Sequence, residues 1–286
     1  MKSWVAILML LPALASFVFG FVAPMIIAGR LSLFDSDYLI EQYVGLGNFV
    51  EAFRDERFMR SFVNVLIFTA AFVPTTIVMT YGVASMLTRF SDGVQSAGRL
   101  LSYIPSLTAG IIIALLWRWL LKREGLINEF IISWGGQGVG WLTQPWTARF
   151  SIIIISLSTG PGALIILSSA TLKSIPPELH DIAIIDGASE SQYRRMIVRP
   201  LMMPTILLIA LLVIVGTMQA WEMLYVLTGE GGPKGSTATP VYDLFRTAFI
   251  YNRPGYAAAK GFILLITIGA LIFAKRKAEQ WAGADA

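Results

Sequence analysis

Long apolar runs dominate this sequence and decide what it can fold into. A bilayer core about 30 Å thick needs about 20 apolar residues in a helix that rises about 1.5 Å per residue. Of the 286 residues, 56% are hydrophobic and only 14% are charged, whereas about a quarter are charged in soluble domains. The sequence therefore predicts an all-α polytopic membrane protein, in which residues 1–286 form a single domain. Six transmembrane helices are expected, at about residues 4–29, 62–87, 101–121, 147–172, 200–227 and 256–274.

The first apolar run also has two features of a signal peptide. Lys2 precedes it, and the "ALA" at residues 13–15 imitates a cleavage site. However, the run continues to Gly29, which is too long for the core of a signal peptide. We therefore predict a retained membrane helix.

An even number of spans places both termini on one side of the membrane. With the termini inside, the inner segments hold ten Lys and Arg residues and the outer segments eleven, counting Lys260, so the totals do not decide the orientation. The cations nearest to the spans favour termini inside, because "KRK" at 275–277 follows the last run and Arg194 and Arg195 precede the fifth. We predict a multi-pass protein of the cytoplasmic (inner) membrane with both termini in the cytoplasm.

Charge and cysteine content exclude several classes of partner and site. The cations lie at the ends of apolar runs, which suits anionic lipid headgroups, and no dense basic stripe suggests nucleic acid. The sequence has no cysteine, so disulfides and cysteine-ligated metals are excluded. Its one histidine, His180, has no second histidine with which to build a metal site, and we interpret it as a solvated loop residue. We expect contact with membrane lipid, no nucleic acid and no metal.

One compact charged segment, residues 178–204, separates two apolar runs. The two prolines at 176–177 suit a first helical turn, where a missing amide donor costs nothing. Gly187 after Asp186 ends this helix, since glycine accepts the left-handed conformation that follows a helix C-terminus. Ser189 with Gln192 three residues later forms a capping box that begins a second helix.

Each of these two short helices has one apolar face. The spacing i, i+3, i+4 is met by Leu179, Ile182 and Ala183 in the first helix and by Tyr193, Met196 and Ile197 in the second. Arg199-Pro200 is expected to close the second helix and begin the fifth span. A unit this short needs either the membrane surface or a partner protein to cover its apolar faces. The acidic residues of the first helix and the glycine hinge favour a partner protein.

The segment "ELHDIAIIDGASESQYRRMIVRPLMMP" resembles the EAA loop of ABC-importer permeases. The matching positions are Asp181-Ile182-Ala183, Asp186-Gly187-Ala188, Tyr193, Ile197, Pro200 and Pro204. The sequence departs from the family pattern at Asp181-Ile182, where Glu-Ala is usual, and at Arg199, where leucine is usual. These departures make the surface that would contact the ATPase atypical.

The resemblance extends from about residue 44 to residue 277. Several segments are similar, in the same order, to segments of carbohydrate-type permeases, a group that includes the maltose and glycerol-3-phosphate importers. They are "VGLGNFVEAF", "IIIALLWRWLLKREGLIN", and "YVLTGEGGPKGSTATPVYDLFRTAF" with "PGYAAAKGF". The resemblance implies the type I ABC importer permease fold, with a cytoplasmic two-helix coupling loop at residues 173–199.

The resemblance also implies a mechanism and a set of partners. The coupling loop would dock into a cleft on a cytoplasmic ABC ATPase dimer, whose closure moves the spans. The partners would be a second homologous permease subunit, the ATPase dimer and an extracytoplasmic solute-binding protein that delivers a sugar. The coupling residues would be Glu178, Asp181, Ala183, Asp186, Gly187 and Ala188, supported by Arg194 and Arg195.

Nucleotide chemistry is expected to belong to another subunit. No G-x-x-x-x-G-K-[ST] phosphate loop occurs in the sequence, and "GPKGS" at 232–236 lacks the required order. We therefore expect no cofactor on this chain and no enzymatic activity of its own, with ATP and Mg used by the partner ATPase.

Two groups of polar residues in the spans are candidates for the substrate pathway. Arg118 is an intramembrane cation, which often marks a pathway, although a position near the end of its span favours simple snorkelling between Trp117 and Trp119. Gln219, Glu222 and Tyr225 are three residues apart, roughly on one helix face, with Trp221 beside them. Aromatic and hydrogen-bonding groups together suit a sugar, and the alternative is contact between helices in the bundle.

Two other functions fit the sequence less well. A secondary transporter would more often show charged or helix-breaking residues in two related halves, and an intramembrane enzyme needs a catalytic set at one depth. Neither pattern is present. We expect a permease for a sugar or oligosaccharide, with glycerol 3-phosphate or another polar solute as the alternative.

Overall fold

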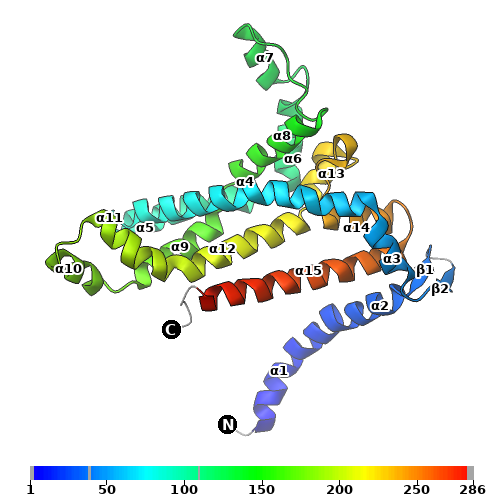
Figure 1. The fold of residues 1–286 in the computed structure, drawn as a ribbon, viewed down its shortest axis with the longest axis horizontal. Coiled ribbons are helices and arrows are strands. Elements are labelled where there is room, and N and C mark those ends of the chain that lie inside the picture. The colour runs from blue at the N-terminus through cyan, green and yellow to red at the C-terminus, as the bar shows by residue number, and fades with distance from the viewer. Residues whose placement is uncertain (1–2, 38–39, 109, 282–286) are drawn as a thin grey trace. The chain divides into compact units, whose positions relative to one another are not determined.

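The structure is a computed structural model that describes residues 3–37, 40–108 and 110–281. Helices make up most of it, as Figure 1 shows, which confirms the all-α prediction. One short antiparallel hairpin is an addition that the sequence did not predict, and it pairs Phe34 with Tyr43 and Ser36 with Glu41.

The elements follow one another along the chain with short connections. In the first third they are α1 Ser3–Phe17, the π-helical turn η1 Val18–Val22, α2 Ala23–Leu31, β1 Phe34–Ser36, β2 Glu41–Tyr43, α3 Gly47–Arg54 and α4 Glu56–Leu87. Next come α5 Asp92–Tyr103, the 3₁₀ turn η2 Ile104–Leu107, α6 Gly110–Leu120, α7 Leu126–Ser133, α8 Pro145–Ser158 and α9 Gly162–Ser174. The last part holds α10 Glu178–Ile185, α11 Glu190–Tyr193, the π-helical turn η3 Arg194–Val198, α12 Arg199–Gln219, α13 Glu222–Thr228, the 3₁₀ turn η4 Pro233–Gly235, α14 Pro240–Phe249 and α15 Pro254–Trp281.

Several of these helices have the length and composition of membrane spans. In the described residues four qualify outright: Met9–Leu31, Glu56–Leu87, Glu190–Gln219 and Pro254–Gln280. Two bent helix pairs, α5–η2 with α6 and α8 with α9, raise the number to six if each pair is one span. This agrees with a polytopic membrane protein.

The third and fourth expected spans are broken rather than continuous. In place of one helix over 101–121, α5 ends in a 3₁₀ turn that contains Pro105, and α6 follows. In place of one helix over 147–172, α8 and α9 meet at a bend of 55°. Gly160 has φ +67° there and Pro161 has no amide hydrogen, so an α-helix cannot continue through them.

The chain forms two compact units. The first comprises Met1–Met59 and Asp243–Thr267, and the second comprises Arg60–Tyr242 and Ile268–Ala286.

A buried ammonium group organises the first unit. Lys260 on α15, which the charge count placed among the outer cations, is only 2% exposed. Its Nζ donates to Asp55 Oδ2 at 2.8 Å, to Asp243 Oδ2 at 2.6 Å and to Thr247 Oγ1 at 3.1 Å. An ammonium has three donors, so all three are used. Lys260 therefore ties α15 to α14 and to the residue that precedes α4, and the headgroup interpretation of this lysine was wrong.

The second unit has an apolar core and one polar anchor. The core is formed where α4, α6, α8 and α13 meet, by residues that include Phe68, Ala114, Ile152, Ile155, Leu224 and Tyr242. Asn64 on α4 donates to the carbonyl oxygens of Gly235 at 2.8 Å and of Ala238 at 2.9 Å. Arg149 on α8 donates to Asn64 Oδ1 at 3.0 Å and to the Ser236 carbonyl at 3.1 Å. The glycine-rich loop before α14 is thus an ordered part of this unit.

We expect Lys260→Met to destabilise the protein by about 3–5 kcal/mol, because it leaves two partly or fully buried carboxylates without a counter-charge. Thermal unfolding of the purified chain in detergent measures the effect. The triple variant Lys260→Met/Asp55→Asn/Asp243→Asn removes all three charges and should recover most of the lost stability. A single Lys260→Met variant as stable as the wild type would contradict this account of the first unit.

The same network predicts a dependence on pH. Burial alone would raise the pKa of the Asp55 carboxyl, but the hydrogen bonds and charge of Lys260, with hydrogen bonds from Tyr256 and the Phe58 amide, lower that pKa below its ordinary value. The carboxylate therefore stabilises the fold above its unfolded pKa of about 3.9, and this contribution is lost as the pH falls through the lower folded value. Between about pH 6 and pH 3, Asp55→Asn should lose stability less steeply than the wild type. Identical slopes would count against the assignment.

Candidate functional site

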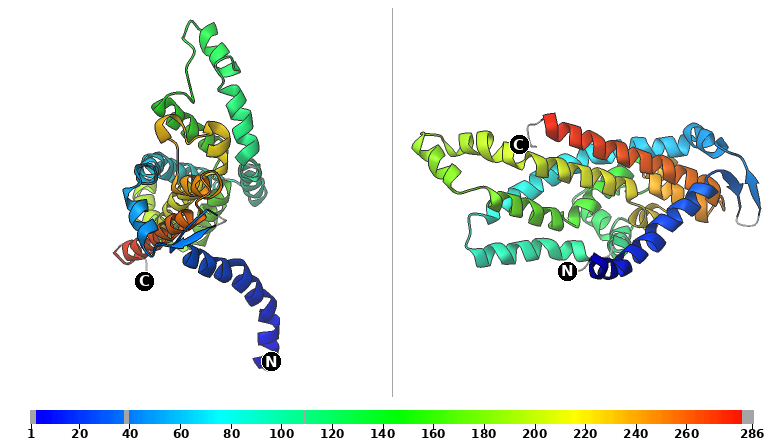
Figure 2. Two further views of the ribbon diagram at one scale, coloured as in Figure 1. Left: turned by 90° about the vertical axis from the view of Figure 1, so that its right-hand side faces the viewer. Right: turned by 90° about the horizontal axis from the view of Figure 1, so that it is seen from below.

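The coupling loop, residues 173–199, places α10 and α11 at one end of the second unit, beyond the ends of α9 and α12 (Figures 1 and 2). Its turn has the predicted glycine geometry. Gly187 has φ +75°, its amide donates to the Ile184 carbonyl at 3.0 Å, and the Ala188 amide donates to the Ala183 carbonyl at 2.9 Å. These two hydrogen bonds form a Schellman motif, in which only a residue with positive φ fits. No atom lies within 4 Å of a Cβ built at Gly187, so its constraint is conformational rather than steric.

The second short helix begins as predicted. Ser189 Oγ accepts from the Gln192 amide at 3.3 Å, and Gln192 Oε1 accepts from the Ser189 amide at 2.8 Å. Both halves of the capping box are therefore present.

A side-chain cluster across the turn holds α10 against α11. Glu190 Oε1 accepts from Arg194 Nε at 2.7 Å, and Glu190 Oε2 lies 3.4 Å from His180 Nε2. The His180 ring also meets the Tyr193 ring edge-on, with 4.8 Å between the centroids. His180 was predicted to be a solvated loop residue: its side chain is 44% exposed, but it lies on helix α10 and contacts both Glu190 and Tyr193 across the turn.

The outer side of α10 is both acidic and apolar. Glu178, Asp181, Asp186 and Gly187 are exposed, while Ala183 is buried. Three isoleucines are uncovered as well: Ile182, Ile184 and Ile185 are 53%, 58% and 83% exposed. The apolar face expected from Leu179, Ile182 and Ala183 is therefore split, because Ala183 packs inward and Ile182 points out. Exposed isoleucines beside carboxylates are unsuited to an anionic lipid surface and suited to a protein partner.

The second helix does not close at Arg199-Pro200, and that prediction was wrong. α11, η3 and α12 form one helix of 30 residues, Glu190–Gln219. The Arg199 amide donates to the Arg194 carbonyl, five residues back, which is the pattern of a π-turn. A proline ring inside an α-helix clashes with the carbonyl four residues earlier, and the wider π-turn just before Pro200 makes room for it. The coupling loop is thereby joined to the fifth span without a break.

Arg118 has a specific partner. Its Nη1 donates to the Val226 carbonyl near the C-terminal end of α13, at 3.0 Å. It therefore links α6 to α13, which neither the snorkelling interpretation nor the pathway interpretation anticipated. It also lies at a cavity of about 530 Å³ together with Lys122, Arg123 and the loop 138–144.

The structure separates the residues that were expected to share a face of the fifth span. α12 ends at Gln219, Ala220 is extended, and α13 begins at Glu222. The expected common face of Gln219, Glu222 and Tyr225 was therefore wrong. Glu222 and Tyr225 remain together on α13 and both are exposed, while Trp221 packs against the core of the unit.

The sequence did not predict the cavity at the two helix breaks, whose mostly apolar walls carry a few hydroxyls. A cavity of about 250 Å³ lies between α4, the α8–α9 bend and the end of α12, and its lining includes Phe72, Thr76, Ser156, Gly160 and Ala220. The dipeptide Gly160-Pro161 inside an apolar run was the available signal, since such pairs usually interrupt helices. Hydroxyls beside an aromatic ring are groups that a sugar can use.

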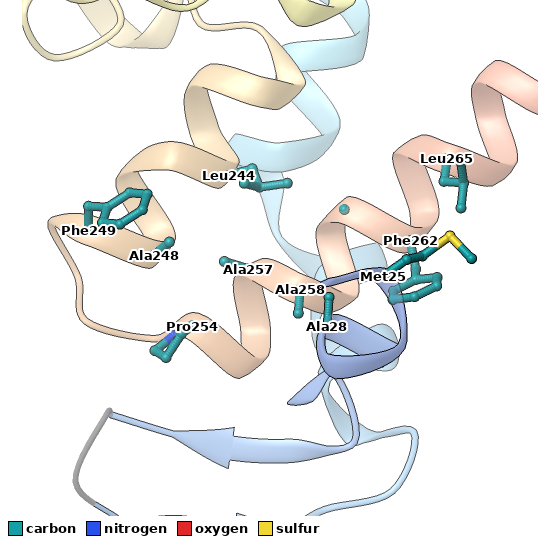
Figure 3. Close-up of a pocket in the computed structure, with 11 residues that line it drawn as sticks. Met25, Ala28, Leu244, Ala248, Phe249, Pro254, Ala257, Ala258, Phe262 and Leu265 are labelled. Carbon is teal, nitrogen blue, oxygen red and sulfur yellow. The ribbon is translucent and has the colours of Figure 1, made fainter. Parts of the chain in front are cut away.

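A groove in the first unit lacks such groups. It has a volume of about 380 Å³ between α2, α14 and α15, and Figure 3 shows that apolar side chains such as Met25, Leu244, Phe249 and Phe262 line it. A sugar hydroxyl would find no hydrogen-bonding partner there. Across the described residues, no group of three or more His, Asp or Glu side chains is arranged to hold a metal ion.

Comparisons with known proteins agree with this architecture. The lactose transport system permease protein LacF of Rhizobium radiobacter is 26% identical over 92% of this chain and 89% of its own length. The sn-glycerol-3-phosphate transport system permease protein UgpA of Yersinia enterocolitica is 28% identical over 97% of this chain and 95% of its own. The crystal structure of a bacterial alginate ABC transporter, in complex with alginate pentasaccharide-bound periplasmic protein, contains a chain with a TM-score of 0.78 and 24% identity, which covers 97% of this chain and 94% of that one.

The profile of the family described as "binding-protein-dependent transport system inner membrane component" matches residues 43–276, which is most of the sequence. The chain therefore belongs to the family of inner-membrane components of binding-protein-dependent transport systems.

Proposed function

We propose that this chain forms half of the translocation pathway of an ABC importer for a sugar or oligosaccharide. A second related permease subunit forms the other half, an extracytoplasmic binding protein delivers the sugar, and a cytoplasmic ATPase dimer hydrolyses ATP with Mg. The chain itself has no enzymatic activity and binds no cofactor, in line with the missing phosphate loop. Both termini lie in the cytoplasm.

The observation that carries the proposal is the coupling loop. It combines a glycine-dependent turn, a side-chain cluster that fixes two short helices, and an exposed surface of carboxylates and isoleucines. A rigid protruding element with this surface suits insertion into a protein cleft. Its continuity with α12 gives a direct mechanical path from that cleft to a membrane span.

Within the loop, different residues have different tasks. Glu178, Asp181 and Asp186 face the ATPase, Gly187 and Ala188 set the turn, and Ala183 packs the helix inward. Arg194 acts through Glu190, and Arg195 supports the same end of the helix.

We expect Gly187→Pro to abolish ATP-driven uptake by the reconstituted complex and to prevent co-purification of the ATPase. Proline fixes φ near −65°, which is incompatible with φ +75°, and it removes the amide that donates to Ile184. Strain of about 1–2 kcal/mol and the lost hydrogen bond together correspond to at least roughly a tenfold loss of binding.

Gly135→Pro is the matched control. Gly135 has φ +81°, donates to the carbonyl three residues back at 2.9 Å, and has no atom within 4 Å of a built Cβ, but it follows α7. Gly135→Pro should keep ATPase binding. Gly187→Asn should be milder than Gly187→Pro, since asparagine tolerates left-handed angles. Normal ATPase binding and uptake by Gly187→Pro would refute the docking role.

The sugar pathway is proposed to run past the breaks at Gly160 and Ala220, towards Trp221, Glu222 and Tyr225. Sugars require hydrogen-bonding partners and aromatic faces, and this region supplies both. Gln219 and Arg118 belong to the same end of the pathway, Arg118 through its hydrogen bond to α13.

We expect Glu222→Gln and Tyr225→Phe each to raise the half-saturating sugar concentration for uptake roughly tenfold, the cost of about one hydrogen bond to a charged group or hydroxyl. Both variants should still bind the ATPase, because neither touches the coupling loop. Glu230→Gln, which alters an exposed carboxylate beyond α13, is the control. Unchanged uptake in both test variants would remove these residues from the pathway.

A phosphorylated solute such as glycerol 3-phosphate is the second candidate. Arg118, Lys122 and Arg123 meet at one cavity, and clustered cations suit an anionic ligand. Uptake of radiolabelled glycerol 3-phosphate that depends on Lys122 and Arg123, with no uptake of sugars, would favour it over the sugar proposal.

A further inference from the structure

A basic groove in the second unit adjoins the coupling loop, and the proposed function uses its Arg194 and Arg195 only to support that loop. It lies between α4 and the helix formed by α11, η3 and α12, and its volume is about 420 Å³. We define the basic groove by its lining residues Arg194, Arg195, Arg199, Val78, Met202 and Ile206. The three arginines come from the helix that continues as α12, and the rest of the lining is mostly apolar, with Tyr81 and Ser191 as further polar residues.

The carboxylates around the groove do not balance the positive charge of its three arginines. Arg194 is paired with Glu190 at 2.7 Å. Arg195 and Arg199 are exposed and lie four residues apart, so two like charges share one side of the helix, which is unfavourable. Among the residues that the structure describes, the ion pairs include no carboxylate partner for either of them. An anion from outside the chain would relieve this repulsion.

The aliphatic wall of the groove indicates what kind of anion fits. Arg199 and Ile206 are seven residues apart, two turns and about 10 Å along one side of the helix, while Met202 between them is 0% exposed and already covered. Val78 on α4 faces the same groove and is 70% exposed. A small inorganic anion would leave this wall uncovered, whereas a molecule with an anionic head and an apolar tail would use both parts.

The position of the groove agrees with such a ligand. The arginines mark the start of a membrane span, where lipid headgroups lie, and this side of the helix runs from there along α12 into the span. With the termini in the cytoplasm this end faces the inner leaflet, whose anionic lipids attract cations near the surface. The carboxylates of α10 are on a different helix from these arginines.

We propose that the basic groove binds an anionic phospholipid. The phosphate pairs with Arg195 and Arg199, and one acyl chain lies along Ile206 and Val78. The bound lipid joins α4 to the first turns of α12, next to the coupling loop.

The test measures lipid retained by the full-length chain, purified in detergent, with native mass spectrometry. The probes are phosphatidylglycerol and phosphatidylcholine with identical acyl chains. The wild type should retain phosphatidylglycerol in preference to phosphatidylcholine. Arg195→Gln/Arg199→Gln should bind phosphatidylglycerol roughly twentyfold more weakly, from two lost contacts between arginine and an anionic headgroup. Arg276→Gln/Lys277→Gln removes two exposed cations near the end of α15 and should bind as the wild type does.

Each remaining outcome decides against the groove. Equal losses in both double variants would show a general charge effect. Displacement of the phosphatidylglycerol by an excess of inorganic phosphate would indicate a free-anion site. Unchanged lipid binding by Arg195→Gln/Arg199→Gln, with loss of ATPase co-purification, would assign the arginines to protein docking. An unchanged melting temperature of this variant excludes misfolding as the cause of any loss.

Discussion

Backbone hydrogen bonding inside a membrane is the constraint on which this structure depends. Lipid offers no donors or acceptors, so helices span it and every break in a helix needs replacement partners. At the break before α13, the Thr239 hydroxyl donates to the Ala220 carbonyl. At the α8–α9 bend, the Ser158 and Thr159 hydroxyls donate to carbonyls three residues back. Both breaks line the same cavity, whose mostly apolar walls carry the hydroxyls of Thr76, Ser156 and Thr217. The few groups that a polar solute could bind there therefore lie where the helical rule is relaxed.

The two units solve the problem of buried charge in different ways. The first holds a full ion-pair triad, in which the ammonium of Lys260 uses all its donors on two carboxylates and a hydroxyl. The second buries uncharged Asn64 against carbonyls and adds Arg149 at the edge. A triad that loses one member leaves an uncompensated charge, which costs more than a lost neutral hydrogen bond. The α3–α4 corner is therefore the more sensitive of the two to single substitutions.

Local signals in the sequence predicted the coupling loop well, whereas contacts between residues far apart in the sequence could not be predicted from it. The Gly187 turn and the Ser189 capping box depend on neighbours within a few residues, and both are confirmed. The continuity of the helix through Pro200 was missed because a π-turn leaves no mark in the periodicity of side chains. Lys260 was misjudged because its partners, Asp55 and Asp243, lie far away in the sequence. The break at Ala220 contains neither glycine nor proline, so no helix-breaking residue in the sequence predicted it.

Most of the acidic residues of the coupling loop lie on one helix and its arginines on the other, and this distribution has a mechanical consequence. The exposed carboxylates of Glu178, Asp181 and Asp186 lie on α10 or at its C-cap, whereas the three arginines at 194, 195 and 199 belong, with Glu190, to the helix that continues as α12. The only ion-pair partners within the described loop that cross this division are Glu190 and His180, at 3.4 Å. A force on α10 therefore reaches α12 through one short turn and one side-chain cluster, rather than through a broad interface. If α12 is also held at its arginines, α10 can turn only about this side-chain cluster. The stiffness of the cluster then determines how much of a movement of α10 outside the membrane reaches the span.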